Sequence, residues 1–169
     1  MLELQNVSKT FNPGTVNEKL ALDHINLHLD PGDFATIVGS NGAGKSPLFN
    51  AIAGEFIADS GHITLDGHDI TFLPDYRRSK EVGRMFQDPL RGTAPHMTIE
   101  ENLALAYLRA SHRSGTFSRI SRADRQLFAE RLSALGLGLE DRMKQPVGLL
   151  SGGQRQALTL LMATLVTPK

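Results

Sequence analysis

The chain has 169 residues, long enough for one domain with a hydrophobic core. Its 40% hydrophobic and 21% charged residues exclude a disordered chain. The 18 basic and 18 acidic residues give zero formal net charge, so we expect no nucleic-acid partner. There is no cysteine, which excludes a disulfide framework, a thiolate nucleophile and a cysteine zinc site, and no signal peptide begins the sequence. We therefore expect a cytoplasmic protein.

The first part of the chain is predicted to form strands and turns. Apolar residues alternate with polar ones at residues 2–4 and 25–29, which indicates half-buried strands. Turns are predicted at residues 12–15 and 31–33, where proline and glycine gather. The apolar run Phe34–Val38 predicts a buried parallel strand that leads into a glycine-rich loop.

Further elements follow that loop. Residues 47–53 predict a helix that ends at Gly54. The Asp66-Gly67 pair after Ile63 and Leu65 predicts a hairpin turn. A short strand is predicted over Val82–Phe86.

The second half of the sequence reads as helices. One is predicted over residues 98–110, and another begins at Ser121, where Asp124 completes a capping-box spacing. Residues 111–120 form a polar loop between them, and a last helix is predicted over residues 154–166. In the second helix, the residues on one apolar face are Leu127, Phe128, Leu132 and Leu135.

Residues 39–46 read GSNGAGKS and match the phosphate-binding pattern G-x-x-x-x-G-K-[ST]. The glycines allow the loop to curl so that its N–H groups point inward at phosphate oxygens. The helix that follows adds its partial positive charge. We expect Lys45 to reach the β- and γ-phosphates and the Ser46 hydroxyl to hold Mg²⁺. The predicted nucleotide-binding residues here are Gly39, Ser40, Asn41, Gly42, Ala43, Gly44, Lys45, Ser46 and Pro47.

Pro47 departs from the related phosphate loops, which carry serine or threonine at this position. Proline has no N–H and no hydroxyl, so two donors for the α-phosphate are absent. It is also expected to bias Ser46 away from helical angles and so to displace the magnesium ligand. We therefore expect weaker nucleotide affinity than a threonine at position 47 would give.

Residues 150–154 read LSGGQ and are followed by Arg155 and Gln156. This run resembles the signature motif of ATP-binding cassette (ABC) proteins. Its hydroxyl and amide groups begin a helix and suit an anion. The resemblance implies that Ser151, Gly152, Gly153 and Gln154 cap the γ-phosphate of ATP bound to the phosphate loop of a second nucleotide-binding subunit, in a head-to-tail dimer.

Two single residues are similar to other family features. Gln87, in MFQDP, resembles the glutamine that contacts Mg²⁺ and the attacking water, so Lys45 and Gln87 are the predicted catalytic residues and Ser46 and Gln87 the predicted metal ligands. Phe11 resembles the aromatic residue that stacks on adenine, although the family favours tyrosine there and a simple core phenylalanine fits almost as well.

The family pattern continues beyond the signature helix with an apolar strand that ends in Asp and Glu, and with a later histidine. This sequence stops at residues 167–169. We therefore expect a chain cut before those carboxylates, which binds ATP and hydrolyses it negligibly.

The resemblance implies an α/β fold: a P-loop NTPase, RecA-like core with an N-terminal antiparallel β-subdomain and a helical subdomain, and with the C-terminal part of the sheet missing. The predicted divisions of this single domain are residues 1–87, 88–153 and 154–169.

The leading hypothesis is the ATP-binding subunit of an ABC transporter, peripheral on the inner face of the membrane and docked on separate membrane-spanning permease subunits. Its cofactors would be ATP and Mg²⁺. The alternatives are a catalytically incompetent nucleotide-binding fragment and a non-transport ABC ATPase.

Overall fold

The chain divides after Ser79 into two units, of which the second begins at Lys80. The computed structural model describes residues 1–86, 88–110 and 120–166. The predicted divisions at residues 87 and 153 stay predictions.

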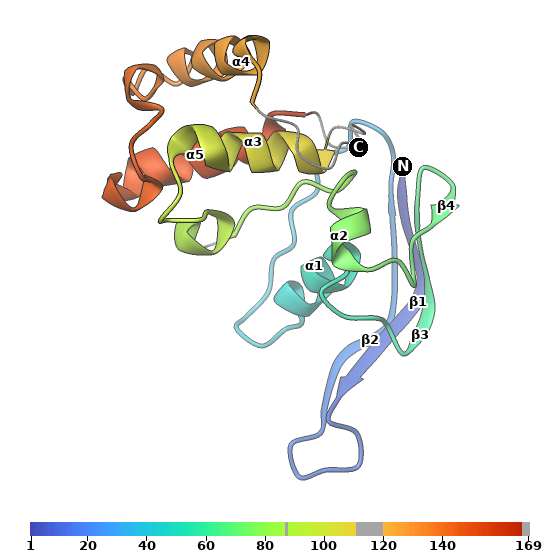
Figure 1. Cartoon of the computed structure of the whole chain (residues 1–169). Helices are drawn as coiled ribbons and strands as arrows, with labels where there is room; N and C mark the ends of the chain where they lie inside the picture. Colours follow the sequence, from blue (N-terminus) through green and yellow to red (C-terminus); the bar gives the residue numbers. More distant parts are fainter. Residues whose placement is uncertain (87, 111–119, 167–169) are drawn as a thin grey trace. The chain divides into compact units, whose positions relative to one another are not determined.

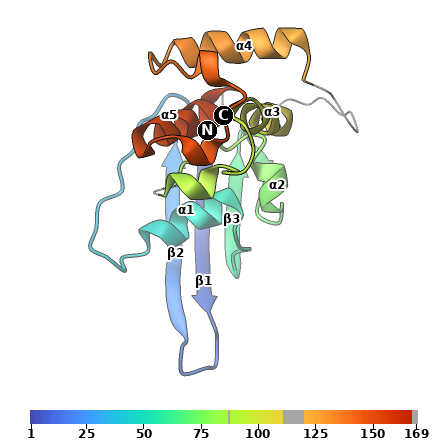
Figure 2. The same ribbon diagram turned by 60° about the vertical axis from the view of Figure 1, so that its left-hand side comes forward.

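The first unit contains one antiparallel sheet, with strand order β2-β1-β3-β4. In Figures 1 and 2 the blue strands β1 and β2 run side by side. The Asp66-Gly67 hairpin turn is confirmed, since both residues have positive φ angles, of 49° and 76°. The predicted strands at residues 2–4 and 25–29 are also confirmed. The strands are β1 (Leu2–Phe11), β2 (Lys19–Leu29), β3 (Ser60–Leu65) and β4 (His68–Asp69).

Two helices belong to the same unit. Helix α1 (Lys45–Ala53) begins two residues earlier than predicted and ends at Gly54 as predicted. The four-residue α2 (Asp75–Arg78) follows the sheet. The buried apolar residues of this unit come from both strands and helix α1: Leu4, Val7, Leu22, Ala51, Ile63, Leu65 and Ile70.

Two predicted strands are not formed. Residues Phe34–Val38 are irregular, with Phe34 96% and Val38 89% exposed, so the predicted buried parallel strand is wrong. Residues Val82–Phe86 are irregular as well. A strand needs a neighbour for its backbone N–H and C=O groups, and among the described residues no strand pairs with either segment. The apolar composition of these two segments was therefore not enough to make them strands.

Arg78 ties the end of α1 to the segment after β4. Its guanidinium donates to the carbonyl oxygens of Ala51 (2.6 Å) and Ile52 (3.2 Å), at the C-terminus of α1. It also donates to those of Thr71 (2.8 Å) and Leu73 (2.8 Å). The residue is only 2% exposed, and burial lowers the pKa of its guanidinium. A cation at a helix C-terminus is favourable because it meets unpaired carbonyl groups there.

Asp59 joins the far end of β1 to the start of β3. One carboxylate oxygen accepts from Lys9 Nζ at 2.6 Å, and the other accepts from the Thr10 amide at 2.7 Å. The Lys9 ammonium first, and then the Thr10 amide, lower the pKa of the Asp59 carboxyl. The charged form of Asp59 therefore favours the folded sheet.

The second unit is helical, and its predicted helices are present. The last of them begins and ends two residues earlier than predicted, at Gly152 and Thr164. Of the predicted polar loop, residues 111–119 lie outside the described residues. The elements of this unit are η1 (Pro89–Gly92), α3 (Ile99–Ala110), α4 (Arg122–Ser133), η2 (Glu140–Arg142), η3 (Val147–Leu149) and α5 (Gly152–Thr164).

Side-chain caps start the helices of this unit. Ser121 and Asp124 form the predicted capping box at α4. Thr98 and Glu101 make the same reciprocal pair at α3, and the Thr98 backbone amide and hydroxyl lower the pKa of the Glu101 carboxyl. These local bonds satisfy N–H groups that a helix leaves unpaired.

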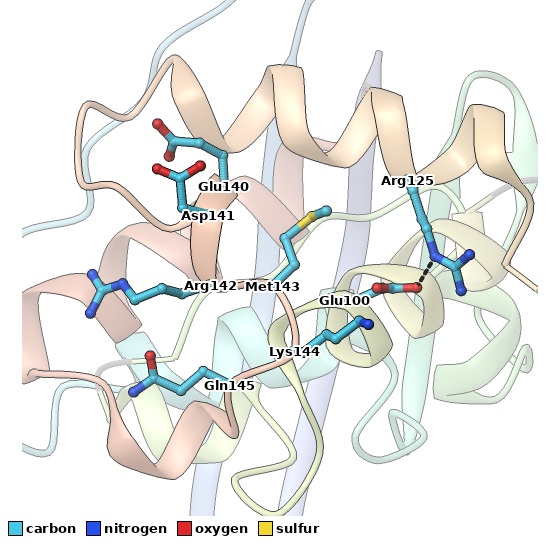
Figure 3. Close-up of a pocket in the computed structure, with 8 residues that line it drawn as sticks. All are labelled: Glu100, Arg125, Glu140, Asp141, Arg142, Met143, Lys144 and Gln145. Carbon is cyan, nitrogen blue, oxygen red and sulfur yellow. Dashed lines mark hydrogen bonds and ion pairs between the residues drawn. The ribbon is translucent and has the colours of Figure 1, made fainter.

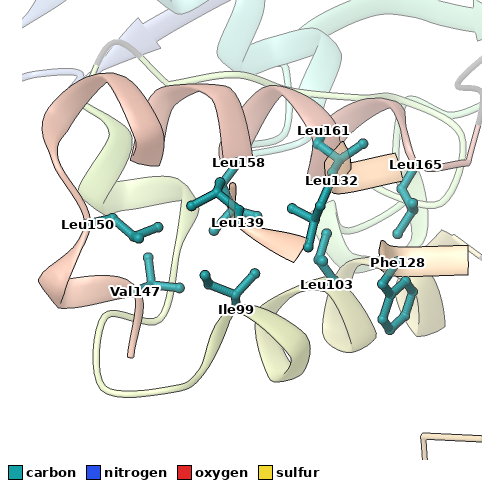
Figure 4. Packing of buried hydrophobic residues seen from close by; sticks show 10 residues of the cluster. All are labelled: Ile99, Leu103, Phe128, Leu132, Leu139, Val147, Leu150, Leu158, Leu161 and Leu165. Carbon is teal, nitrogen blue, oxygen red and sulfur yellow. The ribbon is translucent and has the colours of Figure 1, made fainter. Parts of the chain in front are cut away.

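Figure 4 shows the core of the second unit, in which α3, α4 and α5 contribute side chains to one cluster. Phe128 and Leu132, predicted for the apolar face of α4, are fully buried, and Leu135 packs against the cluster. Leu127 is only half-buried. The cluster consists of Ile99, Leu103, Phe128, Leu132, Leu139, Val147, Leu150, Leu158, Leu161 and Leu165.

We expect Arg78→Met to lower the free energy of unfolding of the first unit by about 3 kcal/mol, because it leaves buried carbonyl groups without a donor. Urea denaturation of the chain measures this change. The exposed neighbour Arg77 offers a matched control, and Arg77→Met should cost no more than about 0.5 kcal/mol. Equal effects of the two substitutions would contradict the capping role of Arg78.

We expect Asp59→Asn to lower stability near neutral pH but not in strong acid. Because the folded pKa of Asp59 is depressed, its contribution is present above the unfolded value of about 3.9 and is lost as the pH falls through the folded pKa. Denaturation of the parent and the variant across acidic pH measures the difference. Lys9→Met should remove much of the same pH dependence, and a difference that persists in strong acid would show another cause.

Candidate functional site

The loop of residues 39–46 lies in the first unit, directly before α1. Gly42 and Gly44 have positive φ angles of 90° and 85°, and Gly44 is the N-cap of α1. A Cβ on Gly44 would lie 3.0 Å from the Ala21 carbonyl oxygen. The second fixed glycine of the motif therefore lets the loop turn tightly against β2.

The Lys45 side chain folds back over this loop. Its ammonium donates to the carbonyl oxygens of Gly39 at 2.5 Å and Ser40 at 2.7 Å. The Ala43 amide also donates to Ser40 O, at 3.2 Å. An ammonium has three N–H donors, so one more is free to meet a phosphate oxygen.

Several donors of the loop are available to an anion. The amides of Gly42, Gly44, Lys45 and Ser46 donate to no acceptor among the described residues, and the Ser46 hydroxyl has no partner there either. The amides of Lys45 and Ser46 are in the first turn of α1, where the helix dipole favours negative charge. This donor set fits a triphosphate, and the Ser46 oxygen suits Mg²⁺, which prefers oxygen ligands.

Pro47 lies in the first turn of α1, and Ser46 before it is helical. The expectation that Pro47 moves Ser46 out of the helix is therefore wrong. A proline in the first turn faces no carbonyl of a preceding helical turn, so its ring meets no clash and the missing N–H is one that the helix would leave unpaired. The expectation that position 47 offers the phosphates neither an amide nor a hydroxyl donor is unchanged.

The signature residues begin α5 in the second unit. Ser151 is the N-cap: its hydroxyl accepts from the Gln154 amide at 3.3 Å, and Gln154 Oε1 accepts from the Ser151 amide at 3.1 Å. Gly152 and Gly153 are exposed, and a Cβ on either would meet nothing within 4 Å. The backbone of this turn is thus open to an approaching anion, while the Gln154 side chain is used in the cap.

Arg155 lies in the first turn of α5, and the sequence suggested no role for it. One of its terminal nitrogens, Nη2, donates to the carbonyl oxygens of Gly148 and Leu150, both at 3.1 Å. Its Nε is buried and has no partner among the described residues. Arg155 therefore braces the turn that leads into the signature motif. One sequence signal could have predicted this role: Arg155 is in the first turn of a helix, within reach of the carbonyl groups that precede the helix.

Phe11 is the last residue of β1 and is half-buried. Its ring meets that of Phe56 edge to face, with centroids 5.1 Å apart. Lys9 Nζ lies 5.8 Å from the Phe11 centroid and 5.7 Å from that of Phe56. Phe11 thus packs as a sheet-end aromatic, and adenine stacking stays a prediction. The contribution of Phe56 and Lys9 was not foreseen, because it depends on residues far apart in the sequence.

The structure brings residues 39–47 together in the first unit and residues 151–154 together in the second. Gln87 lies outside the described residues, so its catalytic and metal roles stay predictions. The described residues contain no group of three or more His, Cys, Asp or Glu side chains suited to a metal. No helix of the described part is long and apolar enough to cross a membrane.

A separate pocket of about 500 Å³ lies in the second unit, between α3, α4 and the segment around η2 (Figure 3). Glu100, 7% exposed, pairs there with Arg125, whose Nε lies 2.5 Å from Glu100 Oε1. Acidic and basic side chains balance in its lining, so it favours no ligand charge. The lining residues are Glu100, Arg125, Glu140, Asp141, Arg142, Met143, Lys144 and Gln145.

Solved structures resemble this chain over nearly its whole length. The dimeric post-hydrolysis state of the ATP-binding cassette MJ0796 bound to ADP and Pi has a TM-score of 0.82 and 28% identity, and covers 99% of this chain and 71% of that one. A dimeric structure of MJ0796 described as a bacterial ABC transporter cassette has a TM-score of 0.79 and 30% identity, with the same coverage. These similarities confirm the predicted P-loop α/β fold class.

Comparison with the sequences of known proteins points to the same kind of protein as the structural similarities. The chain is 40% identical over 174 residues to the tyrosine transport ATP-binding protein of Clostridioides difficile (strain R20291), across all of this chain and 66% of that relative. It thus spans slightly less than two thirds of the relative. The family model described as ABC transporter matches residues 22–169. The chain belongs to the ABC transporter family, as an ATP-binding cassette.

Proposed function

We propose that this chain belongs to the ATP-binding subunit of an ABC transporter: the chain binds ATP with Mg²⁺, and the subunit couples ATP binding and hydrolysis to solute transport. The observation that carries the proposal is the Lys45 ammonium bound to the Gly39 and Ser40 carbonyls beside unpaired amides of the same loop. A ring of inward donors with a spare lysine N–H matches the charge and shape of a β,γ-diphosphate.

Each predicted group has a distinct task in this proposal. The free amides of this loop and the α1 dipole would hold the phosphates, and Lys45 would neutralise their charge. These amides belong to Gly42, Gly44, Lys45 and Ser46. The Ser46 hydroxyl, with Gln87, holds Mg²⁺, which would screen the charge that gathers on the phosphate oxygens. Phe11 offers a ring to the adenine base.

The second nucleotide-binding subunit supplies the other half of the site in this proposal. Ser151, Gly152 and Gly153 begin α5 with an open backbone, which suits the γ-phosphate held by a second copy. Gln154 would join them by leaving its cap. Both MJ0796 structures are dimers, which supports a pairing of this kind.

The chain is proposed to act on the cytoplasmic face of the membrane, docked on separate permease subunits. The name of the tyrosine transport relative supports a transport role. A nucleotide-binding subunit of low affinity and little catalysis is the second candidate, and Pro47 favours it because position 47 offers no phosphate donor.

The test is the affinity of the chain for ATP in the presence of Mg²⁺. Lys45→Ala should weaken binding by about tenfold to a hundredfold, because a charge-assisted bond of about 1.5–3 kcal/mol is lost. Titration with a fluorescent ATP analogue measures it, and the exposed Lys19 serves as control through Lys19→Ala. If both variants bound ATP as the parent does, the phosphate loop would not be the nucleotide site.

Pro47→Thr should tighten ATP binding by about 1–3 kcal/mol, roughly fivefold to a hundredfold. The threonine would restore an amide and a hydroxyl in the first turn of α1. The same titration compares Pro47→Thr with Pro47→Ala, which restores the amide alone. Equal affinity of the parent and Pro47→Thr would show that position 47 takes no part in phosphate binding.

A further inference from the structure

The segment that flanks Gln87 packs against the signature helix at one close contact. Gly92, the last residue of η1, approaches Thr159 of α5 so closely that a Cβ on Gly92 would lie 2.7 Å from Thr159 Cγ2. Thr159 is only 4% exposed. Real Cβ atoms essentially never come this close to another heavy atom, so a side chain at position 92 fits only if the Thr159 methyl group, η1 or α5 moves.

The Thr159 methyl group cannot easily turn away. The Thr159 hydroxyl donates to the Arg155 carbonyl oxygen at 2.8 Å, one turn earlier in α5. This bond fixes the side-chain rotamer and hence directs Cγ2 toward Gly92. Arg155 in turn braces the carbonyls of Gly148 and Leu150, so the contact is linked to the start of the signature motif.

Phe86 is a second neighbour of Gly92. A Cβ on Gly92 would be 3.8 Å from Phe86 Cδ2, an ordinary contact. Two guanidinium groups hold the Phe86 ring, with Arg84 Cζ 4.5 Å and Arg91 Cζ 5.5 Å from its centroid. Phe86 immediately precedes Gln87 in the sequence. We call Phe86, Gly92 and Thr159 the Gly92 anchor.

Backbone bonds extend this link toward Ser151. The Gly148 amide donates to Pro95 O at 2.8 Å, and the Val147 amide donates to Met97 O at 3.0 Å. The buried side chain of Asn102 holds the amide and the carbonyl of Ala94, at 2.8 and 3.0 Å. The segment after η1 is therefore fastened to the turn that precedes the signature motif.

We propose that Gly92 is a positioning residue for the signature motif: its contact with Thr159 makes the η1 segment (Pro89–Gly92) and helix α5 move as one piece. A shift of that segment then displaces Ser151 and its neighbours by a similar amount, because a packed contact transmits displacement rather than absorbing it. This inference rests on the proposed function, in which those residues meet ATP on a second copy.

Two substitutions test the Gly92 anchor: one adds a methyl group at position 92, and the other removes a methyl group at position 159. Gly92→Ala adds a methyl that collides with Thr159 Cγ2, and Thr159→Ser removes that methyl while its hydroxyl can keep the bond to Arg155. The double variant has nothing closer to the new Cβ than Phe86 Cδ2 and residue 159 Oγ, both 3.8 Å away. Gly92 has no positive φ, so alanine is allowed by the backbone.

The readout is a cross-link between two copies. The chain has no cysteine, so Asn41→Cys is introduced in one copy and Leu149→Cys, at an exposed position, in the other. The mixed disulfide between the two copies reports the proposed interface. Disulfide yield is measured with and without ATP for the parent pair and for each methyl variant in the same cysteine backgrounds. The Kd for ATP, which belongs to the phosphate loop, is measured alongside.

We expect Gly92→Ala to lower the ATP-dependent yield about fivefold or more, while the Kd for ATP changes less than about twofold. Thr159→Ser should lower the yield about twofold, and the double variant should return it to near the parent value. A defect that arose anywhere other than at this contact would not be repaired by the second substitution, and the unchanged Kd for ATP separates the effect on Ser151 from a loss of the fold.

An unchanged yield in Gly92→Ala, or a double variant no better than Gly92→Ala alone, would overturn the proposal. If Gly92→Ala does not fold, as circular dichroism would reveal, Thr159→Ser decides alone, and a parent-like yield then refutes the anchor. A parent pair that never cross-links in ATP overturns the head-to-tail pairing itself. That failure is visible before any methyl variant is made.

Discussion

The bond between the Lys45 ammonium and the carbonyl oxygens of Gly39 and Ser40 is the interaction on which the candidate site depends. It closes the ends of the loop over each other without using the loop amides. Those amides are consequently left to an anion, and the start of α1 adds its dipole. A loop held open would offer the same groups, but a phosphate would first have to order them at a cost in conformational entropy.

Features with a local cause were predictable from the sequence. The capping box at Ser121, the turn at Asp66-Gly67 and the end of α1 at Gly54 each depend on a few neighbouring residues. The phosphate loop and the signature motif were identified for the same reason, since their chemistry is written in consecutive residues. The family that these motifs indicated is the one that the comparisons show.

Features that depend on distant partners were not predictable. Residues 34–38 have the composition of a buried strand, but a strand forms only where another pairs with it. Arg78 looked like one basic residue among several, although it caps α1 from 27 positions away in the sequence. Gly92 carried no sequence signal, because its role follows from the position of Thr159, which only the fold determines.

The two anion-binding turns differ in whether their polar groups are already bonded within the protein. In the phosphate loop, the amides of Gly42, Gly44, Lys45 and Ser46 have no competing acceptor among the described residues, so an anion that binds them breaks no protein bond. In the signature turn, the Ser151 hydroxyl and the Gln154 side chain already satisfy each other's backbone amides. A phosphate that recruited both side chains would forfeit a cap of about 1 kcal/mol for charge-assisted bonds of about 1.5–3 kcal/mol each. The exchange is favourable only when a highly charged phosphate is present, so this turn is suited to respond to a triphosphate already bound elsewhere.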